Sequence, residues 1–153
     1  MPITTTQSIA TILNSLIETC KDGQEGFRLA SEEVRDMTLK TVFRELSMER
    51  MEFASELQSL VKGLGEIVPD TGTIGGDLHR GWIALKSVLT QGDDRAILAE
   101  CERGENSVLA EYRDALDHKE LPVYIQNVVH QQYKAIKNSH DRMQDLRDNY
   151  KQT

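Results

Sequence analysis

The chain is poor in the residues that interrupt helices and in those that cross-link small folds. Its 153 residues include three prolines, two cysteines and 5% aromatic residues. The two cysteines, Cys20 and Cys101, are far apart and provide neither a disulfide framework nor the spacing of a metal-binding motif. Both lie among apolar neighbours at helical spacing, so we expect reduced, buried thiols that pack as small hydrophobic side chains. These absences favour a single helical domain large enough to bury its own core.

The chain also lacks a basic excess and a long hydrophobic run. Its formal net charge is -7, which argues against a nucleic-acid partner because phosphate binding needs a basic face. No stretch approaches the ~20 apolar residues that a membrane-spanning helix needs. Residues 1–15 show no cationic region ahead of an apolar one, as a secretion signal would. We therefore expect a cytoplasmic protein with no membrane and no nucleic-acid partner.

Apolar residues recur three and four positions apart along most of the chain, which is the spacing of amphipathic helices. This pattern predicts four long helices. The first runs from Ser8 to Val34, and Asp36 is placed to cap the second. Asp93 or Asp94 starts the third, and Pro122 suits the first turn of the fourth.

The segment between the second and third long helices is the richest in turn residues. Residues 65–76 (GEIVPDTGTIGG) match neither G-x-G-x-x-G nor a P-loop. Asp77 is placed to cap a short helix over residues 78–89 (LHRGWIALKSVL). A connection that carries its own helix can cross from one end of a bundle to the other, so the second and third long helices would run parallel. The sequence thus predicts one all-α domain over residues 1–153, a ferritin-like four-helix bundle with a short extra helix in that connection.

Two glycines lie inside the first predicted helix, at Gly23 and Gly26. A glycine in the middle of a helix costs about 1 kcal/mol relative to alanine. We therefore expect the backbone to be closely packed at that level.

The motif Glu-Arg-x-Glu occurs twice, as ERME at 49–52 and as ERGE at 102–105. Each copy lies near the middle of a predicted long helix, where a bundle helix normally shows apolar residues to its neighbours. At about 100° per residue, Glu105 lies near the centre of its apolar stripe and Glu102 at the margin. Charge in that position must be neutralised by a metal ion or by a buried ion pair.

The same helical-wheel geometry places a few other polar side chains near the interior. Glu49 and Arg50 lie on opposite shoulders of the apolar face of the second helix, and Glu52 points away. On the fourth helix Gln132 points inward, and His140 lies on a shoulder. Parallel second and third helices would bring Glu49, Arg50 and Glu105 to comparable heights.

One interpretation of these residues is a carboxylate-rich site for iron or another divalent metal. Its ligands would be Glu49 and Glu105, with Glu102 and His140 as additions. Di-iron bundles use a Glu from each of two helices and a Glu-x-x-His from each of the other two. No histidine of this chain follows a glutamate at that spacing. The first helix offers no inward carboxylate, because Glu18 and Glu25 point outward.

The alternative interpretation is a buried ion-pair network in which Arg50 reaches across to Glu105. Glu49, Glu102, Arg103 or Gln132 would complete it. Buried charge must be paired and hydrogen-bonded, and arginine can satisfy a carboxylate with two parallel hydrogen bonds. The missing Glu-x-x-His pairs favour this network over the metal site, and both remain open from the residues alone.

Several segments, taken in order, resemble a known family: LNSLIETCKDGQEGF, ERMEFASELQ, LHRGWIALKSVL, ECERGENSVLAEYRDAL and SHDRMQDLRD. The family is an uncharacterised bacterial group of ferritin-like four-helix-bundle proteins, a domain of unknown function. The resemblance covers nearly the whole chain, and the combination of HRGW with ECERGE is its most specific part. It implies a ferritin-like fold and a bacterial, cytoplasmic location, and it implies no activity.

We therefore expect a non-enzymatic, self-associating protein with a structural or stress-related role and no certain cofactor. A homodimer is favoured because outward apolar residues such as Leu29 and Met48 could contact a second copy. The alternative is a metal-binding bundle that acts in metal handling or oxidative stress.

Overall fold

The computed structural model describes residues 5–68, 82, 85–90 and 93–150, and this part of the chain is all-α, without strands. The long helices are α1 (Thr5–Glu33), α2 (Met37–Gly63), α4 (Asp94–Leu116) and α5 (Val123–Asn149), and the short helix α3 (Leu85–Leu89) precedes α4. No helix in the described ranges is both long and apolar enough to cross a membrane.

The predicted caps of the second and third long helices are confirmed, whereas α1 begins three residues before the expected Ser8, and Pro122 immediately precedes α5 instead of lying in its first turn. The Asp36 side chain accepts a hydrogen bond from the backbone N–H of Leu39 at 3.0 Å and caps α2. Asp93 caps α4 in the same way, through the N–H of Arg95 at 3.0 Å. The predicted short helix is described only from Leu85 onward, and Asp77 lies outside the described residues.

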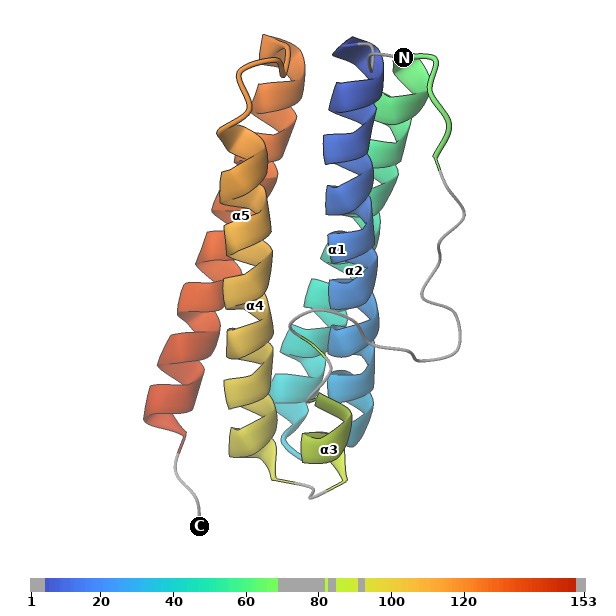
Figure 1. The fold of residues 1–153 in the computed structure, drawn as a ribbon. Coiled ribbons are helices and arrows are strands. Elements are labelled where there is room, and N and C mark those ends of the chain that lie inside the picture. Colours follow the sequence, from blue (N-terminus) through green and yellow to red (C-terminus); the bar gives the residue numbers. More distant parts are fainter. Residues whose placement is uncertain (1–4, 69–81, 83–84, 91–92, 151–153) are drawn as a thin grey trace.

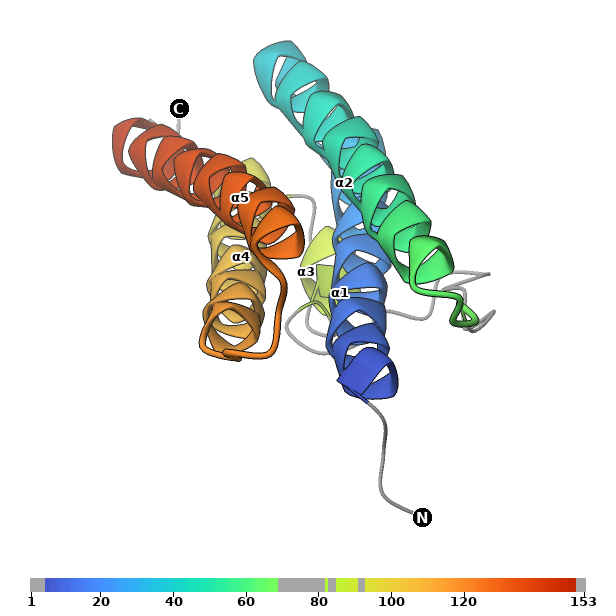
Figure 2. The ribbon, with the colours of Figure 1, turned by 90° about the horizontal axis from the view of Figure 1, so that it is seen from above.

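The four long helices pack as two antiparallel pairs, α1 with α2 and α4 with α5 (Figure 1). α2 ends at the end of the molecule where α1 begins, whereas α4 begins at the opposite end, beside α3. α2 and α4 therefore run in the same direction. Seen from above, the α1–α2 pair and the α4–α5 pair lie side by side (Figure 2). The two pairs contact each other mainly through α1 and α4.

The hydrophobic core consists of two clusters at different heights along the helices. The first holds residues from Ile9–Cys20, Ala54–Val61, Val108–Ala115 and Leu121–Ile136. The second holds residues from Phe27–Val34, Leu39–Leu46 and Ile97–Cys101, together with Trp82, Leu85 and Met143. Between the two clusters, each long helix contributes one residue to a group around the Arg50 side chain: Gly23, Arg50, Glu105 and Ser139. We call these four residues the polar layer.

A second polar contact holds the lower end of the molecule together, around Asp94 on the first turn of α4. Asp94 is 6% exposed, and its carboxylate accepts hydrogen bonds from the backbone N–H groups of Arg35 and Asp36, both at 2.9 Å. The Tyr150 hydroxyl donates to the same carboxylate at 3.2 Å. One side chain therefore joins the α1–α2 corner, the start of α4 and the end of α5.

Candidate functional site

The centre of the polar layer is an ion pair between Arg50 on α2 and Glu105 on α4. Both side chains are fully buried. Arg50 Nη1 donates to Glu105 Oε1 at 2.5 Å, and Nη2 donates to Oε2 at 2.6 Å. Such a bidentate pair is the geometry in which a guanidinium satisfies a carboxylate best. The two residues are 55 apart in sequence, so the parallel course of α2 and α4 brings them together.

α5 completes this layer through Ser139, which the sequence analysis did not identify. Its hydroxyl lies 2.5 Å from Glu105 Oε2, and Arg50 Nη2 donates to it at 3.0 Å. Ser139 lies three residues after Ile136 and four before Met143, both buried. The helical wheel that placed Gln132 inward could therefore have found it.

The space for the arginine comes from α1. A Cβ atom at Gly23 would lie 3.4 Å from Arg50 Nη1 and 3.6 Å from its Cγ, so the guanidinium stem packs directly on the α1 backbone. The Phe27 ring lies next to it, with its centroid 5.2 Å from Arg50 Cζ, within cation–π range. Burial opposes the positive charge, but the charge and hydrogen bonds of Glu105 outweigh it and raise the pKa of Arg50. The guanidinium therefore remains protonated.

Gly26 makes room for a different side chain, that of Trp82. A Cβ atom there would lie 2.4 Å from Trp82 Cε3, and one at Gly104 would lie 2.8 Å from Trp82 Cε2. The buried indole ring is thus wedged between α1 and α4, edge-on to Phe27 at 5.0 Å. The expected close packing is present at both glycines of α1, but side chains rather than a second backbone fill the space.

Glu49 is a half-buried neighbour of the polar layer, next to Arg50. Its Oε1 lies 3.7 Å from Arg50 Nε, and a third of its side chain is exposed. Burial raises the pKa of Glu49, Arg50 lowers it, and Glu105 adds a further increase, so that the net shift is upward.

This shift predicts how stability depends on pH at Glu49. Because the folded-state pKa lies above the unfolded value, the folded chain binds this proton more tightly, and ionised Glu49 costs folding free energy once the pH rises through the folded pKa. Glu49→Gln should therefore raise the free energy of unfolding at neutral pH, by less than about 1 kcal/mol because the group is partly solvated. The gain should disappear below the ordinary glutamate pKa, where both side chains are neutral. Urea titrations at neutral and acidic pH test this, and a gain that persists in acid would contradict it.

A chain of hydrogen bonds runs through the first hydrophobic cluster, which contains Cys20 and Tyr112. The Tyr112 hydroxyl donates to Gln132 Oε1 at 2.7 Å and lies 3.1 Å from Cys20 Sγ. Gln132 Nε2 donates to Glu56 Oε1 at 2.8 Å. Burial raises the pKa of Cys20 to about 11, although the Tyr112 hydrogen bond opposes it, and the thiol stays protonated and unreactive. The predicted buried, reduced cysteines are confirmed, since Cys101 is also free and buried.

Glu102, which is only 6% exposed, and His140 come together between α4 and α5, separate from the polar layer. Arg147 Nη1 lies 2.6 Å from Glu102 Oε2, whereas His140 Nε2 lies 3.9 Å from Oε1. His140 Nδ1 faces its own neighbour Asp141 at 3.1 Å. The charge of Glu102 is thus balanced mainly by Arg147.

The four predicted metal ligands therefore fall into two places. Glu49 and Glu105 lie on either side of Arg50, and Glu102 and His140 lie beside Arg147. Within the described ranges, no group of three or more His, Cys, Asp or Glu side chains is arranged to hold a metal ion. The metal site remains a prediction that this geometry does not favour.

The first helix differs from expectation at one position. Asp22 is only 4% exposed, so α1 carries a buried carboxylate where none was expected. Glu25 pairs with Arg28 at the surface and Glu18 is half-buried.

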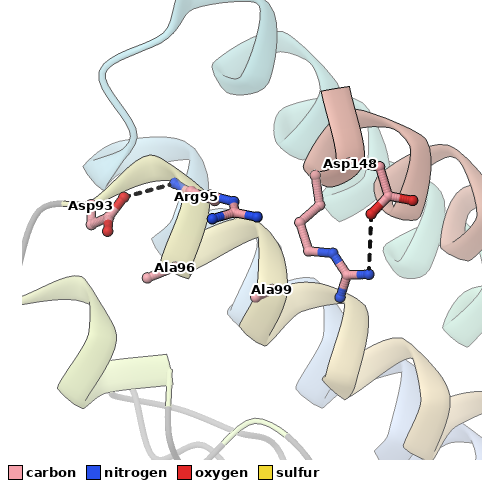
Figure 3. A pocket seen from close by; sticks show the side chains of 6 residues that line it. Asp93, Arg95, Ala96, Ala99 and Asp148 are labelled. Carbon is pink, nitrogen blue, oxygen red and sulfur yellow. Dashed lines mark hydrogen bonds and ion pairs between the residues drawn. The ribbon is translucent and has the colours of Figure 1, made fainter. Parts of the chain in front are cut away.

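A surface pocket of about 430 Å³ lies where the start of α4 meets the end of α5. It is lined by Asp93, Arg95, Ala96, Ala99, Arg147 and Asp148 (Figure 3). Asp93 is already engaged in capping α4, and Arg147 Nη2 lies 3.3 Å from Asp148. The lining thus carries balanced charge, with two aspartates and two arginines.

The comparison with known families fits this geometry. Residues 8–118, from α1 to just beyond α4, match the family described as a domain of unknown function, DUF2383. The chain belongs to this family. No curated protein matches it. The DUF2383 segment contains Arg50, Glu105 and both glycines of α1, while Ser139 and Gln132 on α5 lie outside it.

Proposed function

We propose that this DUF2383 protein is a non-enzymatic, self-associating structural protein built as a ferritin-like four-helix bundle. Two antiparallel helix pairs, a common direction for α2 and α4, and a short helix just before α4 support this fold. They are the features of a bundle whose second and third long helices are joined by a crossover connection.

The observation that carries the proposal is the bond between Arg50 and Glu105 at the centre of the bundle. A metal centre in a bundle needs inward carboxylates that are free to bind cations. Here the central carboxylate is held by a permanently charged guanidinium and by Ser139, and that guanidinium would repel a metal ion. The interior is thus arranged to hold helices together rather than to bind a substrate or a metal.

Self-association is proposed through the outer face of α2. Met37, Met48 and Met51 are 70%, 59% and 45% exposed, and at 100° per residue they lie within about 60° of one another. Flexible methionine side chains adapt well to a partner surface. Leu29, which was also expected to face outward, is instead partly buried against the second hydrophobic cluster.

Elemental analysis tests whether the interior binds a metal. The protein is expressed with iron, manganese and zinc available and is purified without chelator or affinity tag. We expect far less than one metal ion per chain. The metal-binding alternative predicts about one or two ions per chain, lost in Glu105→Gln with the helical content intact, and that result would overturn the proposal.

Light scattering during gel filtration tests the proposed self-association. We expect the mass of a dimer for the wild type and that of a monomer for Met48→Lys/Met51→Lys. Val123→Lys is the matched control, because Val123 is 71% exposed but lies on α5, and it should leave the dimer unchanged. A monomeric wild type would rule out self-association.

A further inference from the structure

Both cysteine thiols are protected from oxidation by the fold. Cys20 and Cys101 are fully buried, one in each hydrophobic cluster. Burial raises the pKa of both thiols, that of Cys20 to about 11. Oxidants attack exposed thiolates, and neither cysteine offers one at neutral pH. The side chains that peroxide usually oxidises first are therefore out of its reach.

The methionines divide into one buried and three exposed side chains. Met143 is fully buried in the second hydrophobic cluster, whereas Met37, Met48 and Met51 are exposed. Each large apolar side chain that α2 exposes is one of these three methionines. Among the residues that the structure describes, the sulfur-containing side chains open to solvent therefore all lie on the outer face of α2.

Met48 and Met51 form the centre of this face. They are three residues apart in one helix, so their side chains are neighbours on its surface. Met37 lies about 16 Å from Met48 along the helix axis, toward the start of α2. This is the face through which self-association is proposed above.

Oxidation changes the chemistry of this face without changing the core. The thioether sulfur attacks one oxygen of hydrogen peroxide with its lone pair, the O–O bond breaks, and the released hydroxide takes the proton of the new S–OH group to form water. The thioether is thereby oxidised by two electrons to a sulfoxide, and the peroxide is reduced. A sulfoxide is polar, so burying it against a partner without a hydrogen bond costs free energy. In a two-fold dimer the same patch comes from both chains, so each sulfoxide enters the contact twice.

We propose that Met48 and Met51, together with Met37, form a peroxide-sensitive modification site that controls self-association: their oxidation to sulfoxides converts the dimer into monomers. The inference rests on the self-association proposed above and adds its regulation. A methionine sulfoxide reductase, with a dithiol as the reductant, returns the sulfoxides to thioethers and restores the dimer. The core and both cysteines stay unchanged throughout.

Treatment of the purified wild-type protein with hydrogen peroxide tests this, with light scattering and peptide mass spectrometry as the readouts. We expect one added oxygen atom on each of Met37, Met48 and Met51, none on Met143 or the cysteines, and a fall of the molar mass by half. Incubation with a methionine sulfoxide reductase and a dithiol should bring the dimer back. Oxidised chains that stay dimeric would overturn this inference and leave self-association standing. An untreated protein that is already monomeric would instead refute self-association, and the inference with it.

The matched control is Met37→Leu/Met48→Leu/Met51→Leu. Leucine keeps the face apolar, carries no sulfur and is a good helix former, so this variant should remain a dimer before and after the same treatment. Its dissociation by peroxide would show that oxidation elsewhere separates the chains, which would also overturn the inference. Circular dichroism should show the same helical content in the treated and untreated wild type, because the oxidised side chains lie outside the core.

Discussion

Replacing Glu105 by glutamine should destabilise the protein by about 3–5 kcal/mol, the range found when one partner of a buried ion pair is removed. Arg50 would keep its charge in a site from which water is excluded, with only a neutral amide opposite it. The total stability of a domain is about 5–15 kcal/mol, so the loss is a large share of it. Urea unfolding followed by circular dichroism measures the change.

Two further variants show whether the loss comes from the unpaired charge. Glu100→Gln removes one partner of the exposed pair with Arg103 and should cost no more than about 1 kcal/mol. Arg50→Met/Glu105→Leu removes both buried charges and should be more stable than Glu105→Gln, because apolar side chains of similar volume often replace a buried ion pair without loss. A double variant as unstable as the single one would contradict this explanation.

Replacing Gly26 by alanine should also destabilise the protein, by about 1–3 kcal/mol, the usual cost of overpacking a core. Helix propensity alone would favour alanine by about 1 kcal/mol. The new methyl group would, however, lie 2.4 Å from Cε3 of Trp82, a ring already held on its other side by Gly104. The expected sign is therefore opposite to that of propensity, and urea unfolding again measures it.

The matched control for this prediction is Gly63→Ala. Gly63 is the last residue of α2, and a Cβ atom there would meet nothing within 4 Å, so this substitution should leave stability unchanged or slightly raised. In a Trp82→Leu background the cost of Gly26→Ala should shrink, since contacting residues couple. An equal cost in both backgrounds would show that the ring is not the obstacle.

The helices and the inward polar residues were predictable because they depend on local spacing. Three- and four-residue apolar repeats gave the four long helices, and the Asp36 and Asp93 caps follow from residues next to each helix start. The inward positions of Glu105 and Gln132 follow from the same repeats, and both are buried.

Contacts between distant segments were less predictable. The slot for Trp82 needs glycines from α1 and α4, and a glycine does not reveal which side chain will fill its space. Asp94 binds two backbone N–H groups at the α1–α2 corner, and backbone groups leave no pattern in a sequence. The two Glu-Arg-x-Glu copies also proved unequal, since Arg50 is buried whereas Arg103 pairs with Glu100 at the surface.

The position of the polar layer has a consequence for how the helices find their alignment. Both hydrophobic clusters are built from similar side chains at similar spacing, so a helix that slid by one turn, about 5.4 Å, would still meet apolar partners. Such a slide would move Arg50 away from Glu105 and place each charge, unpaired, against one of the clusters. A misaligned bundle would thus be less stable than the aligned one by several kcal/mol. The apolar contacts alone would differ little in energy between the two alignments. The ion pair between Arg50 and Glu105 therefore fixes the register of α2 against α4.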